Sequence, residues 1–212
     1  MKKMLIVDDH TIVREGVIRL LKDLLEAPVE FEVAGEAGQA LRMAAATRYD
    51  MVLVDISLPD QSGLELLKLM HQNDPRLPIL VLSTYPEEHY ALRALRAGAL
   101  GYLNKGSAAQ VLKEAVERVI SGKKYVTPSQ AEMLVEAISD ERGNQPVHEV
   151  LSDRELQLVK MMTAGKTLTE IAKELSLSVK TISTYRARIL DKLNLRTTAD
   201  IISFGIQHGL TL

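Results

Sequence analysis

The sequence has no cysteine among its 212 residues, and this absence excludes two kinds of chemistry. Without thiols, the chain forms neither disulfides nor thiolate metal sites. It also has no apolar run near the roughly 18 residues that a membrane span requires, and no internal repeat or low-complexity tract. Asp8 and Asp9 interrupt the apolar start at Met4, which favours a strand over a signal sequence. We therefore expect a cytoplasmic protein with no membrane partner.

Charge is unevenly distributed along the chain, although the net charge is only −2. Residues 150–212 contain nine Lys and Arg against six Asp and Glu, a balance of +3. The remaining residues contain 17 against 22, a balance of −5. An acidic N-terminal part and a basic C-terminal part indicate two functions in one chain. An excess of three positive charges supports nucleic-acid binding only weakly.

Strand and helix patterns alternate from Met4 to about residue 122. Short β-branched runs of the length of buried strands begin at Met4, Phe31, Met51, Ile79 and Leu100. Helix patterns lie between and after them, at 11–26, 38–47, 63–73, 87–97 and 108–121. Because helices separate the strands, the strands should be parallel. The order predicts an α/β fold with a doubly wound sheet of five strands.

The second half of the chain has a different pattern. One amphipathic stretch runs from Pro128 to about Ser139, and residues 140–149 are polar, contain Gly and Pro, and have no period. After Leu151 the pattern is wholly helical to the end of the chain. We therefore predict a domain at 1–122, a linker with a helical segment at 123–148, and an all-α domain at 149–212.

Polar side chains stand at the ends of four predicted strands. Asp8 and Asp9 follow the first strand, Asp55 the third, Ser83 ends the fourth, and Lys105 follows the fifth. The carboxyl ends of parallel strands share one edge, where doubly wound sheets bind ligands. Three carboxylates, a hydroxyl and an ammonium are therefore expected to meet there.

This combination predicts phosphoryl chemistry with Mg²⁺. Carboxylates make the hard oxygen site that Mg²⁺ prefers. A carboxylate such as Asp55, held beside the metal and an ammonium, can attack a phosphoryl group and form an acyl phosphate. Lys105 would neutralise the phosphoryl oxygens, and Ser83 would donate a hydrogen bond to the new group. Movement of Ser83 would let a nearby ring repack, and Tyr102 is the candidate ring.

Each of these residues also has a simpler explanation. An acid after a strand, such as Asp8 or Asp9, is often a helix cap. Ser83 alone is typical of a turn, Lys105 alone of a solvated surface charge, and Tyr102 alone of partly buried packing. Their joint position at the strand ends of one sheet favours a site.

These residues resemble the receiver domain of two-component response regulators over about residues 3–122. The motifs that carry the resemblance are Asp8-Asp9, Asp55 followed by Leu58-Pro59 and Gly63, Ser83, and the run Ala97-Gly98, Gly101-Tyr102 and Lys105. The resemblance implies a flavodoxin-like fold. It also implies a regulatory protein whose receiver assists its own phosphorylation and dephosphorylation, and not an enzyme.

The resemblance further implies roles for individual residues. Asp9 would bind Mg²⁺ directly, Asp8 largely through water, and the backbone carbonyl of Ser57 would complete the protein's share. Asp55 would accept a phosphoryl group from a sensor histidine kinase. One position departs from the family pattern, because Gly106 follows the lysine where many receivers have proline.

The helical half contains a helix-turn-helix pattern. Capping-box spacings occur at Ser152–Glu155 and Thr167–Glu170. A tight link at 176–178 leads to a second helix over 179–193, and two helices joined so closely form a helix-turn-helix. Small Ala172 stands where the two helices must approach each other.

The second helix divides into two faces. We expect its inward stripe to be Val179, Ile182, Ile189, Leu190 and Leu193. Its outward face would carry Lys180, Thr181, Ser183, Thr184, Ala187, Arg188 and Lys192. Small polar residues suit base edges in a major groove, and cations suit phosphates. A plain helical bundle with solvated charges is the alternative for this segment.

Residues 149–212 also resemble the NarL/FixJ-type output domain, a four-helix unit. The resemblance rests on Leu151–Glu155, Ile171-Ala172, Leu175, Ser178, Val179–Ile182 and Lys192-Leu193. It implies binding to double-stranded DNA, with Lys180, Thr181, Arg188 and Lys192 at phosphates, and Ser183, Thr184 and Ala187 facing bases. It also implies that part of the last helix, 197–206, forms a dimer contact.

Together the two halves predict a transcription factor that phosphorylation controls. Phosphorylation of Asp55 would alter the face formed by the fourth helix, fifth strand and fifth helix, and so favour a homodimer, release the output domain, or both. Two alternatives stay open. One is a phosphotransfer enzyme, and the other is a constitutive DNA-binding factor whose receiver is only a dimerisation scaffold.

Overall fold

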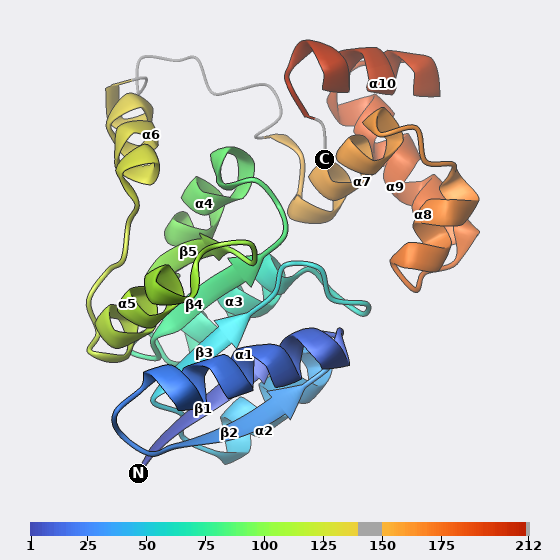
Figure 1. Ribbon diagram of the computed structural model, residues 1–212. Helices are drawn as coiled ribbons and strands as arrows, with labels where there is room; N and C mark the ends of the chain where they lie inside the picture. The colour runs from blue at the N-terminus through green and yellow to red at the C-terminus, as the bar shows by residue number, and fades with distance from the viewer. Residues whose placement is uncertain (140–149, 211–212) are drawn as a thin grey trace. The chain divides into compact units, whose positions relative to one another are not determined.

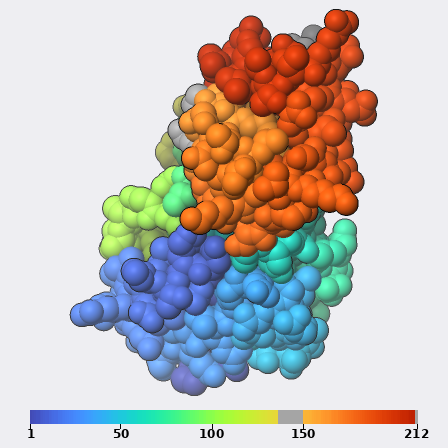
Figure 2. Space-filling view, turned by 90° about the vertical axis from the view of Figure 1, so that its right-hand side faces the viewer, coloured from blue at the N-terminus to red at the C-terminus, as the bar shows by residue number. Residues whose placement is uncertain are grey.

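The computed structural model describes residues 1–139 and 150–210, which form two compact units, Met1–Ala137 and Ile138–Leu212 (Figure 1). Figure 2 draws the side chains of both units in the same colours. The polar stretch at 140–149, nearly all of which belongs to the predicted linker, lies outside the described residues. Within the two described ranges, no helix is both long and apolar enough to cross a membrane.

The first unit contains a five-stranded sheet in the order β2-β1-β3-β4-β5. All the neighbouring strands pair in parallel. The strands are β1 (Lys2–Val7), β2 (Val29–Ala34), β3 (Met51–Val54), β4 (Ile79–Ser83) and β5 (Gly101–Asn104). Every residue of β3 and β4 is buried, as expected for continuous apolar strands covered on both faces. The predicted doubly wound sheet is confirmed.

Five helices cover the sheet, and each lies within two residues of its predicted range. They are α1 (Thr11–Leu24), α2 (Ala37–Ala46), α3 (Gly63–Asn73), α4 (Glu87–Arg96) and α5 (Ala109–Ile120). Helices α1 and α5 pack on one face, and α2, α3 and α4 lie on the other (Figure 1). This two-sided cover leaves the carboxyl edge of the strands to carry a site.

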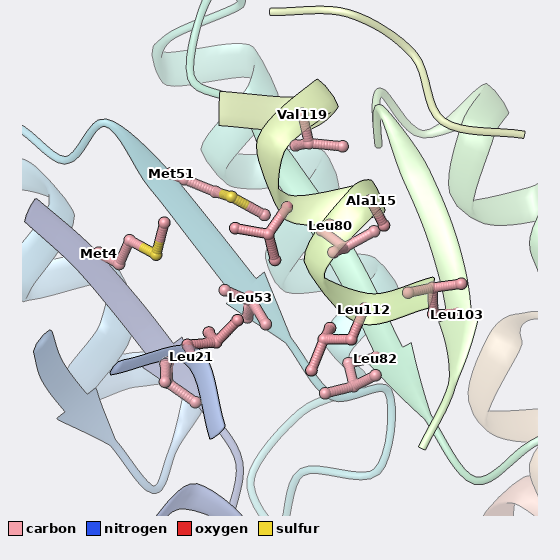
Figure 3. Packing of buried hydrophobic residues seen from close by; sticks show 12 residues of the cluster. Met4, Leu21, Met51, Leu53, Leu80, Leu82, Leu103, Leu112, Ala115 and Val119 are labelled. Atoms are coloured by element: carbon pink, nitrogen blue, oxygen red, sulfur yellow. The ribbon is translucent and has the colours of Figure 1, made fainter. Parts of the chain in front are cut away.

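Alternate strand residues fill the core beneath α1 and α5. Figure 3 shows strand side chains such as Leu53 and Leu80 facing Leu21 of α1 and Leu112 of α5. All four side chains are at most 5% exposed. Because side chains alternate along a strand, the intervening strand residues point to the opposite face.

A further helix, α6 (Pro128–Ser139), follows α5 and coincides with the predicted amphipathic stretch. A bridge between Tyr125 and Gly101 brings the chain along β5 before this helix begins. The start of α6 is therefore held against the first unit.

The second unit contains α7 (Asp153–Thr163), α8 (Leu168–Glu174), α9 (Val179–Lys192) and α10 (Thr198–Gln207). Both predicted capping boxes are present, and a third joins Thr197 and Asp200 at the start of α10. In the link between α8 and α9, Ser176 adopts a left-handed conformation with φ of 52°. The predicted helix-turn-helix is confirmed as α8 and α9.

One prediction about the inward stripe of α9 is wrong. Ile182 and Ile189 are fully buried, and Leu190 and Leu193 are half-buried, as expected. Val179, in contrast, is 44% exposed. It is the first residue of α9, directly after the Ser178 cap, and helical side chains lean toward the N-terminus. Its side chain therefore points past the packed part of the bundle.

Candidate functional sites

Lys105 joins two of the predicted carboxylates at the carboxyl edge of the sheet. Its ammonium lies 2.6 Å from Asp8 Oδ2 and 2.7 Å from Asp55 Oδ2. Asp8 and Asp55 are only 4% and 3% exposed, so these charges are largely withdrawn from water. Buried charges persist only when they are paired, and each carboxylate here has the same cation as its partner.

Asp9 and His10 complete a cluster of four possible metal ligands. Ligand atoms of Asp8, Asp9, His10 and Asp55 all lie within 4.8 Å of one another. The three carboxylates are the ones the sequence predicts. The sequence prediction did not include His10, although its position directly after two acidic residues is a signal for a further metal ligand.

The charges of this cluster act on one another's protonation. Burial raises the pKa of the Asp55 carboxyl and Asp8 raises it further, while Lys105 and the Ser57 backbone N–H act to lower it. Burial lowers the pKa of Lys105, but the Asp55 and Asp8 carboxylates outweigh burial and raise it above its ordinary value. Lys105 therefore stays charged, and a further cation beside Asp55 would favour its ionised, nucleophilic form.

The donor set fits a divalent cation. The Oδ2 atoms of Asp8 and Asp55 both face Lys105, and Asp8 Oδ1 accepts the backbone N–H of His10. Asp55 Oδ1 is buried and accepts no hydrogen bond from the described residues. A buried carboxylate oxygen without a partner is costly, and a hard cation would satisfy it. The acidic cluster is therefore able to bind a metal.

Gly63 permits the tight loop that follows Asp55. Its N–H donates to the carbonyl of Ile56 at 2.9 Å, which folds the chain back on itself. A Cβ at this position would lie 1.9 Å from the backbone oxygen of Asp55 and 2.8 Å from Ile56 Cα. Only glycine allows α3 to start so close to the strand that carries Asp55.

The two predicted switch residues meet at Tyr85, a residue that sequence reasoning missed. Ser83 Oγ accepts the backbone N–H of Tyr85 at 3.3 Å. The Tyr102 hydroxyl donates to the carbonyl of Tyr85 at 2.7 Å. Burial raises the pKa of the Tyr102 hydroxyl, so that it remains a hydrogen-bond donor. Ser83 and Tyr102 are both fully buried and are linked through one peptide segment.

Gln130 ties the start of α6 to this same region. Its Nε2 donates to the backbone carbonyl of Tyr102 at 2.9 Å and to Glu87 Oε2, on the first residue of α4, at 2.7 Å. Gln130 is 1% exposed. Thr127 Oγ1 also donates to Glu87 Oε2, at 3.4 Å. Helix α6 is thus connected by hydrogen bonds to both α4 and β5.

Gly106, the departure from the family pattern, makes a bond that proline cannot. Its N–H donates to Asn104 Oδ1 at 2.8 Å. Asn104 Nδ2 in turn donates to the carbonyl of Thr84 at 3.3 Å. Proline has no N–H, so with proline at this position the Asn104 side chain would lose the hydrogen bond to its Oδ1.

The second unit exposes most of the predicted DNA-facing residues on α9. Lys180, Thr184, Ala187, Arg188 and Lys192 are exposed, and Thr181 and Ser183 are half-buried. A shallow hollow is lined by Lys180, Thr181, Thr184, Tyr185 and Arg188. The Arg188 guanidinium lies 5.9 Å from the centre of the Tyr185 ring, within cation–π range. Two cations thus flank small hydroxyl side chains on one helical face.

Lys192 is engaged within the second unit. Its ammonium lies 2.6 Å from Oε2 of Glu155, the residue whose side chain closes the capping box of α7. Burial raises the pKa of Glu155, but Lys192 and the Ser152 hydrogen bonds lower it by more. Lys192 therefore braces α9 against the start of α7.

The two units match two separate family models. Residues 4–117 match the response regulator receiver domain, and residues 149–204 match the luxR family of bacterial regulatory proteins. The response regulator UvrY of Escherichia coli O6:H1 is 36% identical over 214 residues, which cover 99% of this chain and 96% of UvrY. The response regulator GacA of Pseudomonas syringae pv. syringae is 32% identical over 213 residues, covering 99% and 98%.

The chain is also similar to a solved structure. The structure of two RcsB dimers bound to two parallel DNAs matches with a TM-score of 0.58 and 26% identity. The match covers 96% of this chain and 97% of that one. The match therefore includes residues of both units.

Proposed function

The chain belongs to the NarL/FixJ-type two-component response regulators, in which a receiver is joined to a LuxR-type DNA-binding domain, and we propose that Asp55 is its phosphoacceptor. The observation that carries this proposal is the ammonium of Lys105, which is shared between the buried carboxylates of Asp55 and Asp8. The Lys105 ammonium would neutralise part of the negative charge that a phosphoryl group brings to Asp55.

In the proposed reaction, an Asp55 oxygen attacks the phosphorus of a phosphohistidine on a sensor histidine kinase. The P–N bond breaks, an acyl phosphate forms, and the kinase histidine leaves. Mg²⁺, held by Asp8, Asp9, Asp55 and the Ser57 carbonyl, would supply neutralisation of the phosphoryl oxygens. Lys105 would neutralise the same charge. The receiver thus assists its own phosphorylation and dephosphorylation, while the whole chain acts as a regulator.

The new phosphoryl group then acts on Ser83. It adds about −1.5 to −2 charges and strong acceptor oxygens, which compete for the Ser83 hydroxyl. Movement of Ser83 disturbs Tyr85, whose carbonyl holds the Tyr102 hydroxyl. The backbone carbonyl of Tyr102 accepts a hydrogen bond from Gln130 of α6, which also donates to Glu87 of α4. The change therefore reaches α4 and α6. The output is a homodimer, release of the DNA-binding domain, or both.

We propose that α9 reads double-stranded DNA. Lys180, Thr181, Arg188 and Lys192 would contact phosphates, and Ser183, Thr184 and Ala187 would face bases. For Lys192 this requires exchange of its Glu155 partner for a phosphate. The RcsB structure, which contains dimers bound to DNA, supports a dimeric complex for this chain. Two modules double the phosphate contacts and fix the half-site spacing.

Replacing Lys180 with alanine tests this interface. We expect binding to weaken on every duplex, and the slope of log K against log salt to fall by about 1, because one phosphate contact is lost. Thr184→Val should instead change the preference among sequences. Fluorescence anisotropy over a salt series measures both effects. Lys123→Ala, an exposed cation of the receiver unit, is the matched control. An equal loss in Lys180→Ala and Lys123→Ala would contradict the assignment.

A further inference from the structure

The imidazole of His10 lies inside the acidic cluster. Its Nδ1 is 2.7 Å from Asp9 Oδ1 and 3.2 Å from Asp8 Oδ1. The backbone N–H of His10 also donates to Asp8 Oδ1 at 2.8 Å, which fixes the residue beside this carboxylate. His10 is exposed, so its ring position is set by these carboxylates and not by apolar packing.

The oxygen atoms of the cluster divide into two sets. The Oδ2 atoms of Asp8 and Asp55 are both occupied by Lys105. Asp8 Oδ1 faces His10, as does Asp9 Oδ1, while Asp55 Oδ1 is buried without a hydrogen-bond partner among the described residues. The second set therefore consists of carboxylate oxygens and one imidazole nitrogen. Because Lys105 pairs with the Oδ2 atoms, it does not compete with a bound cation for this second set.

We infer that His10 supplies a nitrogen ligand to the divalent cation of this site, so that the site binds first-row transition metals as well as Mg²⁺. This inference rests on the metal site of the proposed function. Mg²⁺ takes oxygen ligands and keeps its waters, whereas an imidazole nitrogen favours transition metals. In the tautomer that has its proton on Nε2, the Nδ1 lone pair would coordinate the cation in place of the Asp9 contact. His10 thereby sets which metal the receiver uses.

Mn²⁺ titrated into the full chain is the direct probe. Electron spin-echo spectroscopy detects a ¹⁴N nucleus coordinated to Mn²⁺, and calorimetry gives the Mn²⁺ and Mg²⁺ affinities. We expect nitrogen modulation in the wild type and its loss in His10→Ala, with Mn²⁺ affinity about tenfold weaker and Mg²⁺ affinity nearly unchanged. His10→Asn, which keeps a polar oxygen, should bind Mn²⁺ without the imidazole signal. His208→Ala, an exposed imidazole of the second unit, should behave as the wild type.

Two failures can be told apart. If Mn²⁺ binds in competition with Mg²⁺, is lost in Asp9→Asn, and shows no ¹⁴N modulation, the role of His10 is overturned and the metal site stands. If Mn²⁺ does not bind, or binds equally to Asp9→Asn, the proposed metal site itself is overturned. Equal Mn²⁺ affinity and modulation in the wild type and His10→Ala would also overturn the inference.

Discussion

Asp55→Asn protein is expected to take up no phosphoryl group from acetyl phosphate and Mg²⁺, whereas the wild type gains the mass of one. The amide is not a nucleophile for phosphorus, so the loss is complete. The fold should persist, because the change removes a buried charge and leaves Lys105 paired with Asp8. Intact-protein mass spectrometry measures the gain directly.

The matched control is Asp23→Asn, an exposed carboxylate on α1. It should be phosphorylated like the wild type, because Asp23 has no cation and no buried partner at the sheet edge. A phosphoryl group on Asp55→Asn protein would show that another residue, such as Asp9, accepts it. Identical unfolding curves for the wild type and Asp55→Asn would confirm that misfolding is not the cause.

Gly63→Ala should have the largest effect on stability. The added Cβ meets backbone atoms of Asp55 and Ile56, which cannot rotate away as a side chain can. We expect the free energy of unfolding to fall by about 3 kcal/mol, at the upper end of ordinary overpacking. The shift of α3 needed to relieve the clash should also displace Asp55 and slow its phosphorylation. Urea unfolding measures the first effect.

Gly16→Ala is the comparison, because a Cβ there meets nothing within 4 Å on the exposed side of α1. Alanine is the better helix former, so this variant should gain about 0.5–1 kcal/mol. Opposite signs in the two variants would establish close approach, and not glycine's chain entropy, as the reason for Gly63. Equal changes in both would contradict that reason.

The sequence predicts most of the fold because its patterns are local. Continuous apolar strands, helix periods and capping boxes specify each element without reference to the others. Parallel topology then places Asp8, Asp55 and Lys105 at one edge, and the structure brings them within hydrogen-bond distance. The prediction for Val179 is wrong because a helical period of apolar residues does not show where the helix begins. A residue in the first turn can extend beyond the helices against which the rest of the stripe packs.

The parts of the site that were not predicted depend on contacts between distant segments. Tyr85 is bonded to both Ser83 and Tyr102 only because the loop after β4 lies within hydrogen-bond reach of a β5 side chain. Gln130 is 28 residues from Tyr102 and reaches it only through the path that follows α5. Neither position carries a local signal. His10 did have one, as the neighbour of two acids, but a single exposed histidine has too many ordinary explanations.

The most direct test of the central claim is the affinity for DNA before and after the receiver is occupied. The duplex is one enriched from a random pool by the full chain with Mg²⁺ and beryllofluoride, a mimic of the acyl phosphate. We expect beryllofluoride to tighten wild-type binding about 100-fold, or about 2.7 kcal/mol of coupling, and to leave Asp55→Asn unchanged. Equal affinities for the wild type with and without beryllofluoride would contradict this account and favour a constitutive DNA-binding factor with a scaffold receiver.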